Sequence, residues 1–81
     1  MESIAEMNRQ SFENMKKARG LDFLKMQMTV EVNGKRGRVV GNHGHNLLVR
    51  YEKYKASYNC HPHWKTKYYN SEGELIKEYF D

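Results

Sequence analysis

The sequence predicts an α+β, mainly β protein in which an N-terminal helix is followed by a five-stranded barrel or a strongly coiled antiparallel sheet. Over the first twenty residues the apolar side chains recur with a helical period. From Met28 onward they alternate with polar side chains in short runs, separated by Gly and Asn turns about 8–12 residues apart. The chain has 81 residues, which is enough for one domain. Closure into a barrel would remove exposed strand edges, which so small a chain can hardly protect otherwise.

Residues 1–20 are expected to form an amphipathic helix. Ser3 and Glu6 have the spacing of a capping box, and Gly20 follows a basic turn at a position suited to a helix end. The weakly apolar face either covers a small core or docks on a partner. Core cover is favoured because an isolated helix of this length is marginally stable in water. The stripe that forms this face is Ile4, Met7, Ser11, Met15 and Ala18, with Phe12 beside it.

Residues 21–27 form either a connector or a second short helix. Asp22 is suited to cap such a helix, and Leu21 can pack on Met26 across its first turn. The same apolar residues can equally lead as a connector into the first strand. Residues 28–81 then form the β domain.

The strands of the β domain are marked by residues that alternate in polarity and end at turn residues. Val30 and Val32 share one face before the tight turn at Asn33-Gly34. Pro62 ends a later run, since proline cannot donate a ladder hydrogen bond. Five or six short runs favour a small barrel over βαβ units, and we expect five strands in it. The runs are residues 28–32, 38–40, 46–51, 56–60, 64–69 and 75–80.

Aromatic side chains are expected to replace missing aliphatic residues in the core. Only 38% of the residues are hydrophobic, which is low for a folded domain. A regular hairpin around residues 70–73 places Trp64 opposite Tyr79 and Lys65 opposite Glu78. In that register Trp64, Tyr68 and Tyr79 are core residues. The Lys65–Glu78 pair is then an ordinary surface ion pair.

Positive charge is concentrated in the middle of the chain. The net charge is +4, but residues 31–70 alone hold eight basic residues against two acidic ones. Tyrosine rings are interleaved with these cations, and nucleic-acid binders combine cations for phosphates with flat rings for bases. The predicted nucleic-acid or partner surface comprises Lys35, Arg36, Arg38, Arg50, Lys53, Tyr54, Lys55, Lys65, Lys67 and Tyr69.

All four histidines and the only cysteine fall in two short clusters. Two adjacent loops with such residues can supply the four nitrogen or sulfur ligands of zinc. The spacing matches no established zinc finger, so we expect a buried Cys60 and surface histidines rather than a metal site. A metal, if one were bound, would draw its ligands from His43, His45, Cys60, His61 and His63.

Neither catalysis nor a cofactor is expected. Cys60 and His61 are neighbours on a strand, so their side chains point to opposite faces and cannot easily form a nucleophilic pair. The acidic residues cluster at the C-terminus and form no pair with a defined spacing. The Gly34-x-x-Gly37 turn lacks the Lys-Ser/Thr ending of a phosphate loop.

Two motifs in residues 28–80 are Val30-x-Val32-x-Gly34-x-x-Gly37-x-Val39 and Leu48-Val49-x-Tyr51. Their turn glycines and alternating strands resemble the start of SH3-like small barrels, including the KOW type found in ribosomal and transcription proteins. The run from Gly34-Lys35-Arg36-Gly37 to Asn59-Cys60-His61-Pro62 is similar to small uncharacterised proteins of phages and prophages. The resemblance implies an SH3-like barrel that does not include the N-terminal helix.

The leading expectation is a non-enzymatic barrel module that binds RNA or DNA through a basic, Tyr-rich surface. The alternative is a phage-encoded factor that docks on a host enzyme, polymerase or defence nuclease and modulates it. A basic surface fits an acidic or nucleic-acid-binding groove on such a protein equally well. A single Cys and the lack of a long apolar run predict a cytoplasmic protein without membrane contact. We expect a monomer, or a small homo-oligomer formed through the N-terminal helix.

Overall fold

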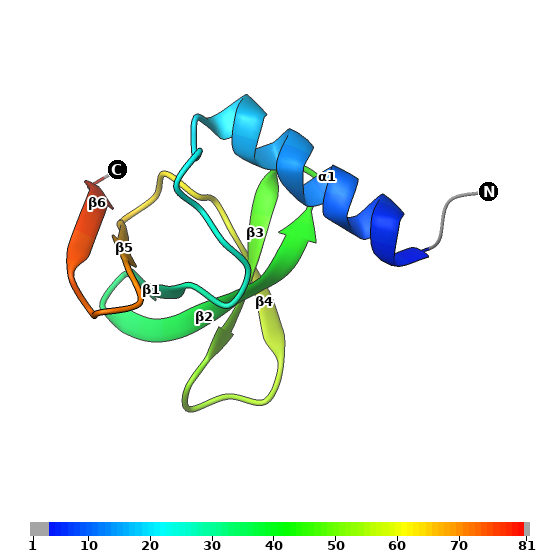
Figure 1. Ribbon diagram of the computed structural model, residues 1–81. Helices are drawn as coiled ribbons and strands as arrows, with labels where there is room; N and C mark the ends of the chain where they lie inside the picture. The colour runs from blue at the N-terminus through cyan, green and yellow to red at the C-terminus, as the bar shows by residue number, and fades with distance from the viewer. Residues whose placement is uncertain (1–3, 81) are drawn as a thin grey trace.

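A computed structural model describes residues 4–80 of the chain, with side chains described from residue 8 onward. It confirms an α+β, mainly β protein with one helix followed by an antiparallel sheet (Figure 1). No helix in this part of the chain is long and apolar enough to span a membrane. The helix is α1 (Ile4–Arg19), and the strands are β1 (Thr29–Val32), β2 (Lys35–His43), β3 (Asn46–Tyr51), β4 (Ser57–Cys60), β5 (Thr66–Tyr69) and β6 (Leu75–Tyr79).

The strands form one sheet in the order β4-β3-β2-β1-β5-β6, and every neighbouring pair is antiparallel. There are six strands where the sequence predicts five, because the short β4 and β6 each pair as separate outer strands. β4 and β6 are not joined to each other by hydrogen bonds, so the sheet of the described residues is not closed. The long β2 is curved, and its register with β3 shifts between Val39 and Gly41 (Figure 1).

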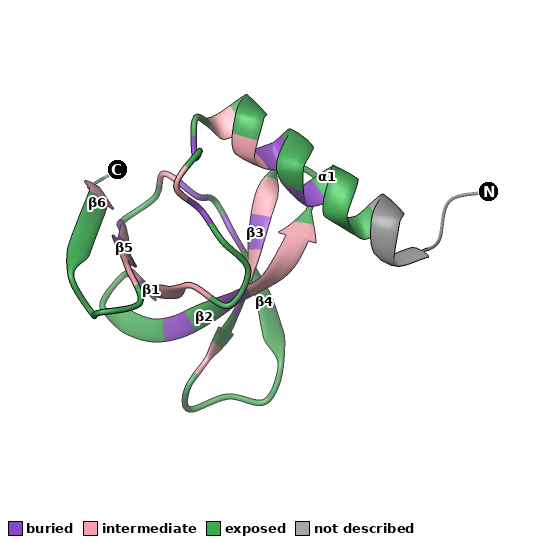
Figure 2. Cartoon of the chain, viewed as in Figure 1, coloured by how far each residue is buried: buried purple, intermediate pink, exposed green. Residues whose placement is uncertain are grey.

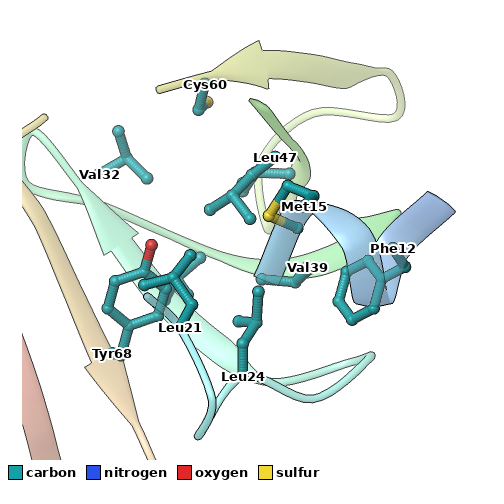
Figure 3. Packing of buried hydrophobic residues seen from close by; sticks show 11 residues of the cluster. Phe12, Met15, Leu21, Leu24, Val32, Val39, Leu47, Cys60 and Tyr68 are labelled. Carbon is teal, nitrogen blue, oxygen red and sulfur yellow. The ribbon is translucent and has the colours of Figure 1, made fainter. Parts of the chain in front are cut away.

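The core lies on the concave side of the sheet, where α1 covers it (Figure 2). Alternation along each strand sends every second residue to this inner face, as in β1, where Val30 and Val32 are buried. Figure 3 shows Phe12 and Met15 reaching from α1 toward the sheet. The buried apolar cluster comprises Phe12, Met15, Leu21, Leu24, Val30, Val32, Val39, Leu47, Val49, Cys60 and Tyr68.

The buried face of α1 agrees with the predicted stripe only in part. Phe12 and Met15 are buried, whereas Ser11 and Ala18 are exposed. Phe12 is the bulkiest apolar side chain of these four residues. Its burial places the Phe12–Met15 side of the helix against the core, so that Ser11 and Ala18 face solvent. The remaining residues that the prediction used lie outside the described side chains; they are Ser3, Ile4, Glu6 and Met7.

The C-terminal end of α1 is fastened to two loops of the β domain. The helix ends before Gly20, as predicted, and Gly20 has a φ of 69° that favours glycine. Nε of Arg19 donates a hydrogen bond to the carbonyl oxygen of His45 (2.8 Å) in the β2–β3 turn. The carbonyl oxygen of Arg19 in turn accepts a hydrogen bond from Nε2 of His63 (2.9 Å) in the β4–β5 loop. These contacts fix the position of the helix over the core.

Residues 21–27 form a connector and not a second helix. Leu21 and Leu24 are fully buried in the core. The backbone N–H of Gln27 donates to the carbonyl oxygen of Val39 (2.7 Å), and the N–H of Val39 donates to the carbonyl oxygen of Met28 (3.0 Å). The end of the connector therefore runs along β2 and uses its backbone groups there instead of in a helical turn.

The last hairpin does not have the predicted register. Tyr69 pairs with Leu75, one residue beyond the partner that a regular hairpin around residues 70–73 would give it, and the register shifts once more between Tyr68 and Tyr69, so that Lys67 pairs with Glu78. The ion pair across this hairpin joins Nζ of Lys67 to Oε2 of Glu78 at 4.0 Å. The predicted pairing of Lys65 with Glu78 is therefore wrong.

The three aromatic residues predicted for the core have different positions. Tyr68 is fully buried and Tyr79 is packed against the core, but 43% of Trp64 is exposed. Trp64 precedes β5 in a turn in which Lys65 has a φ of 45°, so strand alternation does not turn the indole inward. The prediction is confirmed for Tyr68 and wrong for Trp64.

The buried Tyr68 hydroxyl should make stability depend on alkaline pH. It donates a 2.6 Å hydrogen bond to the carbonyl oxygen of Pro62, and burial, with smaller effects of Tyr79 and Cys60, raises its pKa well above the ordinary value of about 10. The unfolded chain loses this proton first, so the free energy of unfolding should fall as pH rises above about 10, by up to about 1.4 kcal/mol per pH unit.

Urea denaturation at several pH values between 8 and about 11.5 measures this dependence. Tyr68→Phe should be less stable at pH 8 by about 1–2 kcal/mol, because the Pro62 carbonyl loses its donor. Its stability should then fall less steeply with pH than that of the wild type. Parallel curves for the two proteins would contradict the assignment to Tyr68.

Candidate nucleic-acid interface

The structure divides the predicted surface residues between the two faces of the sheet. Along β2, Gly37 and Val39 are buried on the inner face. Lys35, two residues before Gly37, belongs to that face, whereas Arg36 and Arg38 belong to the outer face. The predicted surface residues of β2 therefore do not form one continuous surface, although they are neighbours in the sequence.

The inner face continues beyond the core into a cavity of about 440 Å³, which we call the aromatic pocket. Its lining residues come from β2, β3, β4 and the loops that follow β3 and β4; the β3–β4 loop extends from the end of the sheet opposite α1 (Figure 1). β3 contributes Tyr51, and β4 contributes Tyr58 because Tyr58 pairs with the inward-facing Val49. The lining residues are Lys35, Tyr51, Tyr54, Tyr58, Asn59, Cys60, His61 and Trp64.

The three tyrosines of the aromatic pocket contact one another. The ring centroids are 5.6 Å apart for Tyr51 and Tyr58, 6.2 Å for Tyr51 and Tyr54, and 5.9 Å for Tyr54 and Tyr58. The Tyr51 hydroxyl is hydrogen-bonded to Sγ of Cys60 (3.3 Å), and burial together with this contact raises the pKa of Tyr51. Tyr51 is thus held in place by Cys60, and the rings of Tyr54 and Tyr58 pack against it.

The outer rings of the aromatic pocket remain accessible. Tyr54 is 46% exposed, Tyr58 is 44% exposed and Trp64 is 43% exposed. All three side chains line the pocket. They are positioned to stack against a flat ligand group without movement of the core.

Lysines lie near two of these rings. Nζ of Lys35 lies 6.0 Å from the centroid of the Tyr54 ring, and Nζ of Lys65 lies 5.4 Å from that of Trp64. Lys53 and Lys55 flank Tyr54 in the exposed β3–β4 loop. None of the described residues that line the pocket is acidic. The pocket therefore favours a ligand that combines flat rings with negative charge.

Of the residues that line the aromatic pocket, the predicted surface includes only Lys35 and Tyr54, and the half-exposed rings that it omits are Tyr58 and Trp64. Tyr58 was detectable in principle, because its alternation with the buried Cys60 places both on the inner face. Trp64 was not, since its exposure follows from the turn before β5 and from a register shift that local patterning does not reveal.

The other predicted residues lie on the outer face, away from the aromatic pocket. Nζ of Lys67 is 3.7 Å from Oε2 of Glu31, so its charge is compensated. The Tyr69 hydroxyl donates to the same carboxylate oxygen (3.2 Å), and the Arg36 guanidinium lies 5.6 Å from the Tyr69 ring centroid. Arg38 and Arg50 also belong to this face because they pair across β2 and β3.

The structure does not gather the metal-ligand candidates into one site. His43 and His45 lie at the β2–β3 turn, and Cys60 is buried beside Tyr51. The ring of His63 stacks on Tyr79 with centroids 4.4 Å apart. Among the described side chains, those of residues 8–80, no three His, Cys, Asp or Glu are placed to hold a metal ion.

His61 instead lines the aromatic pocket. Its Nδ1 accepts a hydrogen bond from the backbone N–H of His63 (3.1 Å). Burial, together with the positive charge of Arg19 and the neighbouring His63, lowers the pKa of His61 from its ordinary value of 6.5. A neutral imidazole at pH 7 adds a further flat surface to the pocket and no charge.

Comparisons of the chain with protein families, with curated proteins and with solved structures find no match. The interpretation of the aromatic pocket therefore depends on its own chemistry. Half-exposed rings can stack on bases, and the surrounding lysines can contact phosphates. No described residue in it forms a nucleophile–base pair with an orienting third group.

Proposed function

We propose that this protein is a non-enzymatic module that binds single-stranded nucleic acid. Bases stack on Tyr54, Tyr58 and Trp64, and lysines at the rim contact the phosphate backbone. The observation that carries the proposal is the grouping of three half-exposed aromatic side chains around one cavity of about 440 Å³ that has Lys35 and no acidic residue in its lining.

The exposure of these rings favours a binding role over a structural one. The chain has one Trp and only 38% hydrophobic residues, yet it leaves Trp64 and two tyrosines half-exposed in one place. Burying such rings would contribute more to stability than leaving them at the surface. Their contact with a ligand offsets that loss, whereas scattered exposed rings would need no such explanation.

We also propose that the β domain is a variant of the SH3-like barrel. Support comes from the resemblance of residues 28–80, from the antiparallel succession β1-β2-β3-β4 and from the curvature of β2. In this interpretation β4 and β6 are the strands at which the barrel stays open. The aromatic pocket then lies at the β4 side of the opening.

The proposal is tested by titrating the protein with fluorescently labelled single-stranded DNA and RNA of about 12 nucleotides, near the upper site size of a small binding fold. Binding should quench the fluorescence of Trp64, the only tryptophan, and should weaken steeply as salt is raised. Tyr54→Ala and Trp64→Ala should each reduce affinity about 5- to 150-fold, since stacking contributes about 1–3 kcal/mol per base.

Phe80→Ala is the matched control for these variants. Phe80 is the most exposed large apolar residue described, at 74%, and it does not line the aromatic pocket. This substitution should change affinity less than about twofold. An absence of binding to every strand at low salt would overturn the proposal, as would equal losses in Phe80→Ala and Trp64→Ala.

The alternative is a factor that docks on a protein that itself handles nucleic acid. Exposed apolar side chains near β6, namely Leu75, Ile76 and Phe80, favour a protein contact on that side of the molecule. A pull-down performed with and without nuclease separates the two functions. A stoichiometric protein that survives nuclease and is lost on Ile76→Asp supports docking, and recovery of nucleic acid alone supports the leading proposal.

A further inference from the structure

The outer face of the sheet holds a second cavity, of about 460 Å³, which we call the outer pocket. It is separate from the aromatic pocket and shares no lining residue with it. One wall is the connector before β1, the floor is β1 and β2, and the other wall is the β5–β6 turn. The residues that define its chemistry are Lys25, Gln27, Arg36, Arg38, Tyr69 and Asn70.

The outer pocket is strongly cationic. Lys25, Arg36 and Arg38 line it, and none of its described lining residues is acidic. No ion pair joins any of these three cations to another described residue. Glu31 lies directly opposite Arg36 across β1 and β2, but its carboxylate is engaged by Lys67 and by the Tyr69 hydroxyl. An anion that entered the pocket would therefore meet an excess of positive charge.

The arrangement of the arginines is unfavourable without such an anion. Arg38 lies directly opposite Arg50 across β2 and β3. Like charges in directly opposite positions destabilise a sheet. A bound anion would remove this repulsion, and neither arginine has an acidic partner among the described residues that does so.

The walls of the outer pocket are held in place before any ligand binds. The Arg36 guanidinium lies 5.6 Å from the centroid of the Tyr69 ring, which limits its freedom. Oδ1 of Asn70 accepts hydrogen bonds from the N–H groups of Glu72 (3.0 Å) and Glu74 (2.9 Å) and so fixes the β5–β6 turn. Gln27 has a φ of 69°, a backbone conformation that only a few per cent of non-glycine residues adopt.

We propose that the outer pocket binds a phosphate group of a phosphorylated ligand. Arg36 and Arg38 present planar guanidinium groups that suit two phosphate oxygens each, and Lys25 contributes a third positive charge from the connector. The volume lies within the range of about 300–1,000 Å³ that is typical of small-molecule sites. The phosphate belongs either to a free nucleotide or to a nucleic-acid backbone.

NMR titration of the full-length ¹⁵N-labelled chain at low ionic strength tests the proposal. The probes are inorganic phosphate, a nucleoside 5′-monophosphate and the corresponding uncharged nucleoside. The first two should shift the amide signals of residues 25–29, 36–38 and 69–73, and the nucleoside should not. Absence of these shifts with both phosphate probes would overturn the proposal, as would equal shifts with the nucleoside.

The double variant R36Q/R38Q should weaken phosphate binding by about tenfold or more, because charge-assisted contacts are lost. Arg9→Gln, at an exposed position of α1, should leave phosphate binding unchanged. Arg38→Lys keeps the charge and loses the planar fork, so an intermediate affinity is expected. The ¹⁵N spectrum of each variant reports its folding, and an unchanged affinity in folded R36Q/R38Q would contradict the proposal.

Two further arms identify the source of the phosphate and separate this proposal from the proposed function. Stronger shifts with an oligonucleotide that lacks terminal phosphates assign the site to a nucleic-acid backbone, and stronger shifts with the monophosphate assign it to a free nucleotide. Trp64→Ala should weaken binding of the oligonucleotide and leave the response to inorganic phosphate intact. Loss of that response in Trp64→Ala would overturn the independence of the outer pocket.

Discussion

Gly37→Ala should lower the free energy of unfolding by about 3 kcal/mol, one of the largest effects expected from a single methyl group in this protein. A Cβ atom at Gly37 would lie 2.6 Å from the carbonyl oxygen of Arg50, 2.9 Å from Cγ1 of Val49 and 3.0 Å from Cα of Tyr51. Two of these three atoms belong to the backbone of β3. The methyl group can therefore be accommodated only if β2 and β3 move apart.

Gly41→Ala on the same strand is the matched control. The nearest atom to a Cβ at Gly41 is Cδ1 of Leu48, at the ordinary contact distance of 3.7 Å. Its effect should be near zero or stabilising by up to about 1 kcal/mol, since alanine lowers the entropy of the unfolded chain. Urea denaturation followed by circular dichroism measures both variants, and similar stabilities would contradict the close approach of β3 to Gly37.

Gly37 also explains why one substitution should affect both candidate sites. It separates Arg36 from Arg38 on the outer face and pairs with Tyr51 of the aromatic pocket on the inner face. A displacement of β3 would move Tyr51 away from Lys35 and change the spacing of Arg38 and Arg50 across the two strands. The packing of one glycine therefore positions both pockets.

Features of the fold that depend on local patterning could be predicted from the sequence. The helix ends before Gly20, and the turn at Asn33-Gly34 has positive φ values of 51° and 82°, as its residue types indicate. The inward positions of Val30 and Val32 follow directly from their alternation. In each case a few neighbouring residues determine the conformation.

The features that the sequence did not predict depend on contacts between distant residues. The register shift at Tyr68 and Tyr69 determines which residues of β5 and β6 pair, and no local sequence pattern predicts it. The number of strands and the open edge likewise follow from how β4 and β6 pair, not from their own residues. Trp64 was assigned to the core because the expected register was regular.

For the candidate sites, the sequence indicated the chemistry but not the geometry. The clustering of cations and tyrosines in residues 31–70 is visible in the composition. The division between two faces depends on which strand residues point inward, so Lys35 and Arg36 lie on opposite faces although they are neighbours. No sequence pattern indicates that Lys25 belongs to a site, because the connector reaches the outer pocket only through its hydrogen bonds with β2.

Phe12→Ala should lower the free energy of unfolding by about 3–5 kcal/mol, which is a large share of the roughly 5–15 kcal/mol typical of a whole domain. The Phe12 side chain is only 4% exposed and belongs to the same buried cluster as Met15, Leu24 and Val39. Removing the ring leaves a cavity between α1 and the sheet, and the hydrogen bonds of Arg19 at the C-terminal end of the helix oppose its collapse. Much of the protein should therefore be unfolded at 37 °C.

Asn14→Ala, on the exposed side of α1, is the control and should change stability by less than about 0.5 kcal/mol. Urea denaturation, together with the mass of the protein in solution, decides between the two roles predicted for the helix. A large loss of stability at constant mass in Phe12→Ala identifies α1 as the cover of the core. Unchanged stability with a change in mass would instead make this face an interface between copies, because a ring that contributes nothing to the monomer fold must be buried against something else.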